Sequence, residues 1–493
     1  MLIPFRLSGL IAMLSFGIAG ASSLSPELRV TRLNNNQPII HQGLFKAYAP
    51  DGPPESLHPE DLEAYQEFYG KEIDRKGKPF QVSGEATNIN GPCMVRVPSW
   101  LKDHEKADPR ANYYLYFAHH GSPFIRMAWA QHIEGPHTLY NMHPVNRDLE
   151  GGDTQPGRGV LDLGSSFKRV IYGKVKPTVK LTTKVHLKNN IASPDVIIDD
   201  ENERFIMFFH SHAEKPTFDS RKANTSKQKT FVATSRTGLN FNMPGDPKNL
   251  PQGGVHGGEP GHGIKPAYLG NAYFRTFIYG GHIYAFTNYG PLWKGPDATF
   301  TGKSNRPFNY DGIWDTSLRG NDERGDIWMQ MENPTENPIK RDIARMKPPG
   351  ISPKDNSPDF TRASTQTARH FATHLHADGR TLEVWYTARN DRPERIFRTV
   401  MDLAQVDSKG NPVDWHNWST QVDNPVDVHQ MMLTPEYPWE GSELPIKGGG
   451  NGQTDFAHAM RDPDLFQDID GTLYLLYVGG GESAIGIARV DTL

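Results

Sequence analysis

Histidines recur at similar places along this chain of 493 residues, close to short apolar runs. Six of them lie at or near such runs in three repeated units: His119, His120, His210, His212, His370 and His374. An imidazole has an unperturbed pKa near neutrality, so it can act as a general base or as a proton donor without help from burial. Their similar positions predict that the imidazoles gather around one opening. The alternative is that each histidine ends a strand and hydrogen-bonds to neighbouring backbone.

Arginine occurs inside two extended runs. Arg275 lies within AYFRTFIY, where a guanidinium in a strand requires an anion as its partner. That anion is either a protein carboxylate or an acidic group on a ligand. Arg126, within FIRMAWA, and His374 are further candidates for ligand binding.

A third group of possible ligands lies in the glycine-rich segment GGVHGGEPGHG. Here His256, Glu259 and His262 are close enough in sequence to share a cation. The spacing differs from the helical HExxH pattern, and glycine on nearly every side argues against a rigid site. We therefore assign no metal ligand and expect no required cofactor, with a structural or channel-bound cation such as calcium as the alternative.

Five aromatic-rich runs predict the strands that must position these residues. The runs are Tyr113 to Ala118, Phe205 to Phe209, His282 to Thr287, Leu382 to Thr387 and Leu473 to Val478. Their starts are 77 to 100 residues apart, which suits sheets of four strands that carry insertions. Most are preceded by one extended run and followed by another, as in an antiparallel meander. One meander cannot bury both of its faces, so five must pack around an axis. We predict an all-β fold, a five-bladed β-propeller with long inter-blade loops.

Composition agrees with this fold and excludes some functions. The 47 Gly, 39 Pro and 10% aromatic residues suit a turn-rich β domain. A net charge of −4 provides no basic field of the kind that supports nucleic-acid binding. The single cysteine, Cys93, excludes an intrachain disulfide and is interpreted as a small buried residue rather than a nucleophile.

The first residues have the pattern of a signal peptide, which we assign to residues 1–21. Arg6 supplies the positive charge, Leu7 to Ala19 the apolar stretch, and the small residues up to Ala21 a cleavage site. We expect a secreted or periplasmic protein after cleavage near Ala21. No later stretch has the ~20 apolar residues needed to span a bilayer.

One large domain, preceded by a lead-in segment, follows in this interpretation. Residues 22–83 form a lead-in segment with a short helical candidate at 58–69, and residues 84–493 form the propeller. Residues 240–270 and 290–362 are long loops rich in glycine or proline. Loops of this length in a compact fold tend to be functional or disordered.

Parts of the chain resemble a known family. The segments GPCMVRVPSW, YYLYFAHH and IRMAWAQHIEGPHTLY resemble the opening blade of the five-bladed propeller glycosidases, the glycoside hydrolase family 43-like superfamily. The segment RDPDLFQDIDGTLYLLYVGGGESAIGIA is similar to the blade of that superfamily that contains an Arg-Asp-Pro motif. The resemblance covers roughly Asn88 to Val490.

The resemblance implies three acidic groups at one end of a central channel: a base, an acid and a carboxylate that tunes the acid. Asp195 and Asp462 match two of these positions. Glu394 and Glu482 are candidates for the acid because each lies in a turn that enters a third strand, and Glu394 is the preferred proton donor. The chain departs from the family at Asn90-Gly91-Pro92-Cys93, where the first blade usually offers its base and no carboxylate is present.

Together these features predict a secreted enzyme that cleaves glycosidic bonds by hydrolysis, in an acidic (uronate or sulfated) polysaccharide or oligosaccharide. The predicted catalytic residues are Asp195, Asp462, Glu394, His119, His120 and His210. The predicted substrate-binding residues are Arg275, His374, Arg126 and Glu482.

Two alternatives stay open. Propeller-based polysaccharide lyases use a His or Tyr base to remove the C5 proton of a uronate while arginine neutralises its carboxylate, and the chain offers His119, His210, Tyr273 and Arg275 for this. The other alternative is a non-catalytic propeller whose tryptophans stack on sugars.

Overall fold

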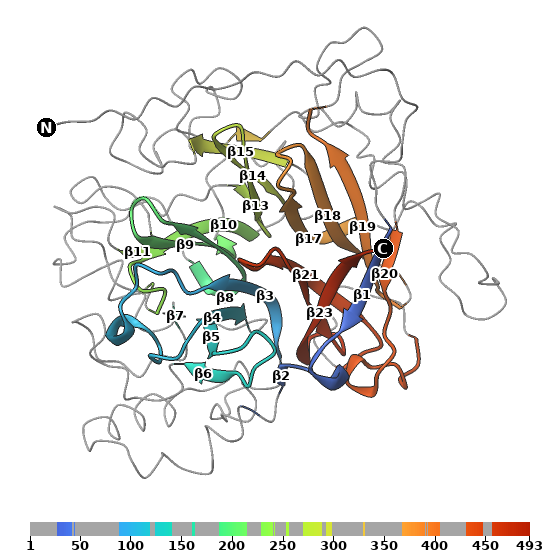
Figure 1. Ribbon diagram of the computed structural model, residues 1–493. Helices are drawn as coiled ribbons and strands as arrows, with labels where there is room; N and C mark the ends of the chain where they lie inside the picture. The colour runs from blue at the N-terminus through green and yellow to red at the C-terminus, as the bar shows by residue number, and fades with distance from the viewer. Residues whose placement is uncertain are drawn as a thin grey trace, which may run out of the picture.

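The protein is a five-bladed β-propeller, in which five antiparallel sheets are arranged around a central axis (Figure 1). The computed structural model describes residues 27–41, 44, 88–118, 124–140, 160–162, 187–213, 228–239, 241, 253–255, 270–287, 292–297, 329–330, 367–389, 391, 393–404, 430–446 and 456–493. The predicted all-β class and blade number are therefore confirmed.

The first three blades follow one another along the chain, each beginning with its innermost strand. Blade 1 contains β3 (Asn90–Arg96), β4 (Tyr113–Ala118), β5 (Phe124–Ala130) and β6 (Thr138–Tyr140), with β7 (Leu161–Asp162) paired to β5. Blade 2 contains β8 (Leu187–Asp199), β9 (Arg204–Ala213), β10 (Gln228–Ser235) and β11 (Gly253–Val255), with β12 (Gly270–Asn271) paired to β10. Blade 3 contains β13 (Arg275–Tyr279), β14 (His282–Phe286), β15 (Leu292–Asp297) and β16 (Met329–Gln330).

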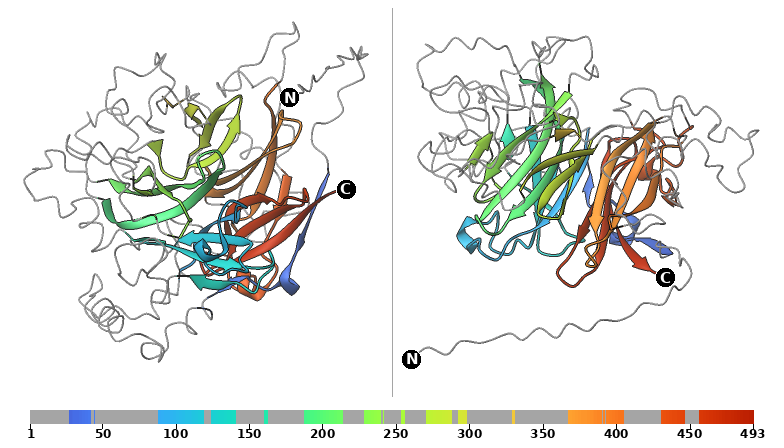
Figure 2. Two further views of the ribbon diagram at one scale, coloured as in Figure 1. Left: turned by 60° about the vertical axis from the view of Figure 1, so that its left-hand side comes forward. Right: turned by 90° about the horizontal axis from the view of Figure 1, so that it is seen from above.

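The last two blades bring the ends of the described chain together. Blade 4 contains β17 (Thr367–Leu375), β18 (Thr381–Arg389), β19 (Ile396–Asp402) and β20 (Gln430–Leu433). Blade 5 contains β21 (Met460–Gln467), β22 (Leu473–Gly479) and β23 (Ala484–Thr492). Its outer positions are filled by β1 (Leu28–Arg32) and β2 (Ile40–His41), both paired with β23 (Figure 2). Three short 3-10 helices are η1 (Asn34–Asn36), η2 (Asp103–Glu105) and η6 (Pro438–Glu440).

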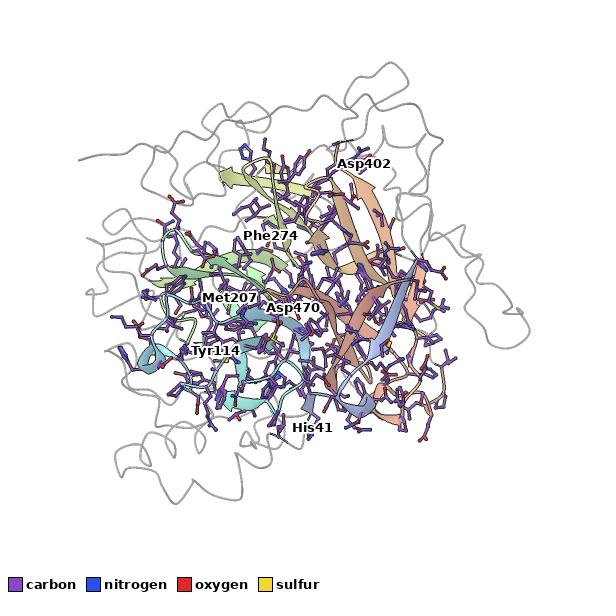
Figure 3. The ribbon with its side chains drawn as sticks, in the orientation of Figure 1. His41, Tyr114, Met207, Phe274, Asp402 and Asp470 are labelled. Carbon is purple, nitrogen blue, oxygen red and sulfur yellow. The ribbon has the colours of Figure 1, made fainter. Side chains whose placement is uncertain are left out.

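Alternating side chains bury both faces of each sheet, because successive residues of a strand point to opposite sides. In β4, Tyr114 and Tyr116 pack toward blade 2, whereas Leu115 and Phe117 pack toward blade 5. Figure 3 shows Tyr114 and Met207 on the two sides of the boundary between blades 1 and 2. Among the described residues, one apolar cluster lies between each pair of neighbouring blades.

The innermost strands share one irregularity, a residue in the left-handed backbone conformation near the start of each. These residues are Gly91, Ser193, Tyr273, His370 and Asp462, with φ between 45° and 67°. In four of the five blades the strand pairing shifts at this point, as in a β-bulge. A bulge re-aims a side chain, and left-handed residues other than glycine mark strain of the kind found at functional sites.

The predicted strands largely match those observed. The five aromatic runs correspond to β4, β9, β14, β18 and β22. No strand was expected at β17, and the lead-in assigned to residues 22–83 contains β1 and β2, which belong to the propeller. Four short strands, β11, β12, β15 and β16, fall in the segments predicted to be loops. The predicted signal peptide and the helix at 58–69 lie outside the described residues.

Candidate functional site at the propeller axis

One residue from each blade meets its neighbours at one end of the axis. Asp462 Oδ2 lies 3.3 Å from the backbone nitrogen of Gly91, and Asp462 Oδ1 lies 3.0 Å from His370 Nδ1. The ring of His370 lies against Tyr273 with a centroid distance of 5.2 Å, and Tyr273 lies against His210 at 4.2 Å. We call these residues the axial cluster: Gly91, His210, Tyr273, His370 and Asp462.

Asp462 is held in its ionised form beside His370. Burial opposes ionisation of Asp462 most strongly, but His370, Arg275 and Arg369 together outweigh it, so the pKa of Asp462 lies below its ordinary value. The Nδ1 of His370 is buried and, despite its distance of 3.0 Å, is not aligned for a hydrogen bond to Asp462. Within the described residues, Nε2 of His370 has no hydrogen-bond partner and is reachable by solvent. The carboxylate thus faces one side of the ring and leaves the other side to a ligand.

Glu394 lies beside this cluster and is held by two arginines. Arg369 donates from Nε and Nη2 to its two oxygens at 2.9 and 2.7 Å, and Arg461 donates from Nε at 2.7 Å. Although burial opposes ionisation, these guanidinium groups hold the pKa of Glu394 at about 2. Thr387 also donates its hydroxyl to Glu394. A proton donor needs a raised pKa, so this environment argues against the predicted role of Glu394 as the acid.

Glu482 joins blade 5 to the start of blade 1, and Arg126 binds carbonyls at the same place within blade 1. Asn88 Nδ2 donates to Glu482 Oε2 at 2.6 Å, and Arg461 Nη1 lies 3.5 Å from Glu482 Oε1. Arg126 Nη2 donates to the carbonyls of Asn88 and Ala118, both at 2.6 Å. Their contacts are with the protein itself, and their predicted roles in substrate binding stay predictions.

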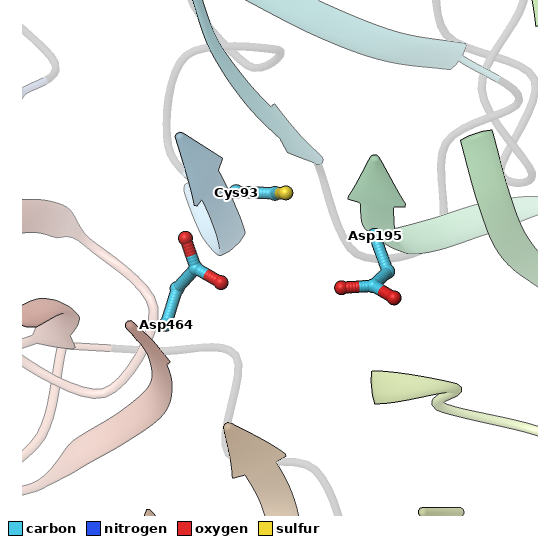
Figure 4. A group of neighbouring side chains, drawn as sticks. All are labelled: Cys93, Asp195 and Asp464. Atoms are coloured by element: carbon cyan, nitrogen blue, oxygen red, sulfur yellow. The ribbon is translucent and has the colours of Figure 1, made fainter. Parts of the chain in front are cut away.

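Asp195 lies in a second set of side chains, together with Cys93 and Asp464 (Figure 4). Each comes two residues after the left-handed residue of its strand and accepts a backbone N–H of the next blade. The three contacts are Met94 N–H to Asp464 Oδ2 at 2.9 Å, Val196 N–H to Cys93 Sγ at 3.2 Å and Thr276 N–H to Asp195 Oδ2 at 2.9 Å. These side chains therefore fasten one blade to the next.

Burial dominates the electrostatics of this second set. It raises the pKa of Asp195, against the influence of Arg275, and raises that of Asp464 to about 7. The ligand atoms of Cys93, Asp195 and Asp464 lie within 4.8 Å of one another, so they are the described residues best placed to hold a cation. Arg275 Nη1 lies 3.9 Å from Asp195 Oδ1 and donates to the carbonyl of Pro194 at 2.8 Å. Its partners in this structure are thus protein groups, although its predicted role toward a substrate is not tested by these contacts.

The remaining predicted residues lie apart from the axial cluster or outside the described chain. His374 is four residues after His370 on β17, roughly 13 Å along a strand that rises ~3.3 Å per residue. Its ring contacts His376, and burial followed by the charge of His376 lowers its pKa to about 4. Five candidate residues lie outside the described chain: His119, His120, His256, Glu259 and His262. The side chain of His212 is also not described.

Arg369 was missed in the sequence, and a signal for it exists. It directly precedes the left-handed His370, as Arg461 directly precedes the left-handed Asp462. Two blades thus place arginine and an ionisable residue side by side in equivalent positions. The contact between His370 and Asp462 joins residues 92 positions apart and has no local sequence signal.

Comparison with known proteins gives distant similarities. No family model matches the chain. It is 24% identical over 409 residues to uncharacterized protein R118 of Acanthamoeba polyphaga mimivirus, covering 82% of this chain and 83% of that protein. Similar solved structures include a thermostable family-43 glycoside hydrolase at 11% identity and a TM-score of 0.36, covering 82% of this chain and 88% of that one.

Two further solved structures are of the same kind. Endo-1,5-alpha-L-arabinanase from Thermotoga petrophila is 11% identical with a TM-score of 0.36, covering 82% of this chain and 70% of that one. A GH43_1 enzyme from Xanthomonas citri complexed with xylose is 10% identical with a TM-score of 0.35, covering 83% and 91%. The first and third of these solved structures are described as family-43 enzymes, and the second as an arabinanase. The propeller itself is assigned from its own five sheets.

Proposed function

We propose that this protein hydrolyses glycosidic bonds of a carbohydrate at the axial cluster. The observation that carries the proposal is the pair of His370 and Asp462, an imidazole with one nitrogen open to a ligand and an ionised carboxylate on its other side. The pair lies where the inner strands of neighbouring blades come together. This arrangement is the one expected of a proton-transfer residue with its orienting anion.

In the proposed reaction, Nε2 of His370 accepts a proton from the water that attacks the anomeric carbon. Asp462, 3.0 Å from Nδ1 on the other side of the ring, offsets the positive charge that the ring acquires, as a carboxylate does for a catalytic histidine elsewhere. The leaving sugar oxygen needs a proton from a second group. We propose that His119 or His120, which lie outside the described residues, supplies this proton. The contacts of Asp195 support only a role in fastening one blade to the next.

The finer parts of the proposal concern the substrate and the location of the protein. We propose an acidic (uronate or sulfated) carbohydrate, supported by the arginines around the axial cluster. We also propose that the protein is secreted or periplasmic, on the pattern of its first 21 residues. Within the described residues, no helix is long and apolar enough to cross a membrane. No nucleic-acid partner and no required cofactor are expected.

A polysaccharide lyase is the second candidate, and one observation favours it. Tyr273 lies between the imidazoles of His210 and His370, with ring centroids 4.2 and 5.2 Å away. Elimination at a uronate needs a base for the C5 proton and an acid for the leaving oxygen, and neighbouring His and Tyr side chains can supply both.

Incubation with neutral, uronate-containing and sulfated polysaccharides distinguishes these candidates. New reducing ends without the ultraviolet absorbance of an unsaturated uronate are expected for hydrolysis. If reducing ends and absorbance rise together, elimination replaces hydrolysis. A protein that binds these glycans and produces neither signal would be the non-catalytic propeller.

A further inference from the structure

Two arginines share the carboxylate of Glu394 but differ in what else surrounds them. Arg461 is enclosed, with 2% of its side chain exposed, and also lies 3.5 Å from Glu482. Arg369 has Glu394 as its ion-pair partner and keeps 12% of its side chain exposed. Arg461 thus forms ion pairs with two carboxylates, whereas the ion pair of Arg369 within the described residues is with Glu394, and Asp462 acts on it from farther away.

The exposed edge of Arg369 has hydrogens left to donate. Its Nε and Nη2 bind Glu394, which fixes the plane of the guanidinium. Among the described residues, Nη1 has no hydrogen-bond partner, and it is not one of the buried unsatisfied atoms. A guanidinium fixed along one edge is pre-organised to bind an anion with the other.

The position of Arg369 relates this edge to the axial cluster. It is the residue before His370, and its charge acts on Asp462 and is itself influenced by Tyr273. Because Arg369 and His370 are neighbours in the chain and both act on Asp462, a sugar bound at His370 is placed near this arginine. Arg275 is less suited, since 4% of its side chain is exposed and its Nη1 already binds Pro194.

We infer that Arg369 is the specificity-determining residue that binds the carboxylate or sulfate of an acidic sugar through its Nη1 edge. This inference rests on the proposed function and adds the group that selects the substrate. A charge-assisted hydrogen bond contributes about 1.5–3 kcal/mol, which corresponds to roughly a 10-fold to 150-fold preference for the acidic sugar.

The test compares Arg369→Gln with Arg461→Gln, because each removes one guanidinium from Glu394. For the full-length protein and both variants, kcat/KM is measured on a uronate-containing oligosaccharide and on its carboxyl-reduced counterpart. A sulfated oligosaccharide and its desulfated counterpart form a second pair. We expect Arg369→Gln to lose about 10-fold to 150-fold on the acidic member of one pair, mainly through KM, and little on its neutral counterpart. Arg461→Gln should change kcat/KM by the same factor on both members of each pair.

The outcomes separate this inference from the proposed function. If the wild-type protein cleaves no carbohydrate, the proposed function fails. If the wild-type protein cleaves acidic and neutral counterparts equally well, Arg369 selects nothing and the inference is overturned without any variant. Equal losses on both counterparts in Arg369→Gln overturn it as well. Arg369→Lys keeps the positive charge but lacks the planar guanidinium with its parallel N–H donors. If Arg369→Gln does not fold and Arg369→Lys does, the lysine variant should keep part of the preference for the acidic sugar.

Discussion

Two carboxyl groups on β21 show how placement decides charge. Asp462 and Asp464 are two residues apart and both buried. Asp462 faces His370, Arg275 and Arg369, and its pKa falls below the ordinary value. Asp464 has a buried carboxyl neighbour in Asp195, and burial raises its pKa to about 7. Two carboxyl groups that are buried to a similar extent therefore have pKa values shifted in opposite directions, because only Asp462 has enough positive charge nearby.

Asp464→Asn should make the protein more stable than wild type at neutral pH. The folded protein holds this proton up to about pH 7, whereas an unfolded Asp releases it near 3.8. The group's favourable contribution is thus complete below that lower pH and is lost as the pH rises to about 7. Asparagine keeps an acceptor for Met94 N–H, so the variant should gain up to about 4 kcal/mol over wild type between pH 4 and pH 8. Urea denaturation across that range measures the difference.

Asp462→Asn, in the same strand, should change the stability of the protein in the opposite direction at neutral pH. Its lowered pKa stabilises the fold above the ordinary carboxyl pKa, and this contribution is lost as the pH falls. The variant should therefore fall behind wild type at neutral pH and approach it in acid. Parallel pH profiles for the two variants would contradict the assigned environments.

Among single residues, the sequence named several neighbours of the site but gave no information on the charges that surround them. Asp462 and His210 are in the axial cluster, and His370 and Tyr273 were recognised as candidates. Glu394 was assigned as an acid, yet two arginines keep it ionised. The partners of a buried carboxylate come from other blades, so its protonation has no signal in neighbouring sequence.

At the scale of elements, the bulged inner strands set the height and direction of the site residues. The left-handed residues of blades 3, 4 and 5 place Tyr273, His370 and Asp462 in the axial cluster. In blades 1, 2 and 5 the residue two positions after the left-handed one binds the backbone of the next blade. The alternation of apolar residues predicted these strands well, because both faces of each sheet are buried. The bulges were not predicted, since four of the five left-handed residues are not glycine.

Gly91→Ala tests how closely the inner strands approach. Gly91 has φ of +57°, and an added Cβ would lie 2.8 Å from the backbone Cα of Ser193 in blade 2. Gly379 has a similar φ of +62° but nothing within 4 Å of an added Cβ. Gly379→Ala should cost about 1–2 kcal/mol from the left-handed conformation alone. Gly91→Ala should lower the free energy of unfolding by clearly more, and urea denaturation of both variants measures the difference. Equal losses would mean that strands β3 and β8 move apart easily.

At the scale of the whole molecule, the N-terminal strand closes the ring. Strand β1 pairs with β23, so residues 28 and 492 are partners in one sheet. Arg32 at the end of β1 donates to the buried Glu440 from Nε at 2.8 Å and to the carbonyl of Thr434 at 2.8 Å. Within the segment called a lead-in, strands β1 and β2 are therefore part of the propeller. Its role could not be predicted because pairing between the two ends of a chain leaves no periodic pattern.

Arg32→Met should loosen this closure. It leaves Glu440 buried without its guanidinium partner, a loss typically worth about 3–5 kcal/mol. Arg29→Met is the matched control on the same strand, since Arg29 is 62% exposed and lies 3.8 Å from Asp491. The control should cost under about 1 kcal/mol. The denaturation midpoints of both variants give the comparison, and a stable Arg32→Met protein would show that closure does not depend on this pair.

The central claim is that His370 performs proton transfer at the propeller axis, and its most direct test is the kcat of His370→Asn on the best substrate of the panel. Asparagine tolerates the left-handed conformation and retains an N–H toward Asp462, so folding should be preserved while Nε2 is lost. We predict a fall in kcat of about 10²-fold to 10⁴-fold. Unchanged turnover in a folded His370→Asn protein would contradict the account.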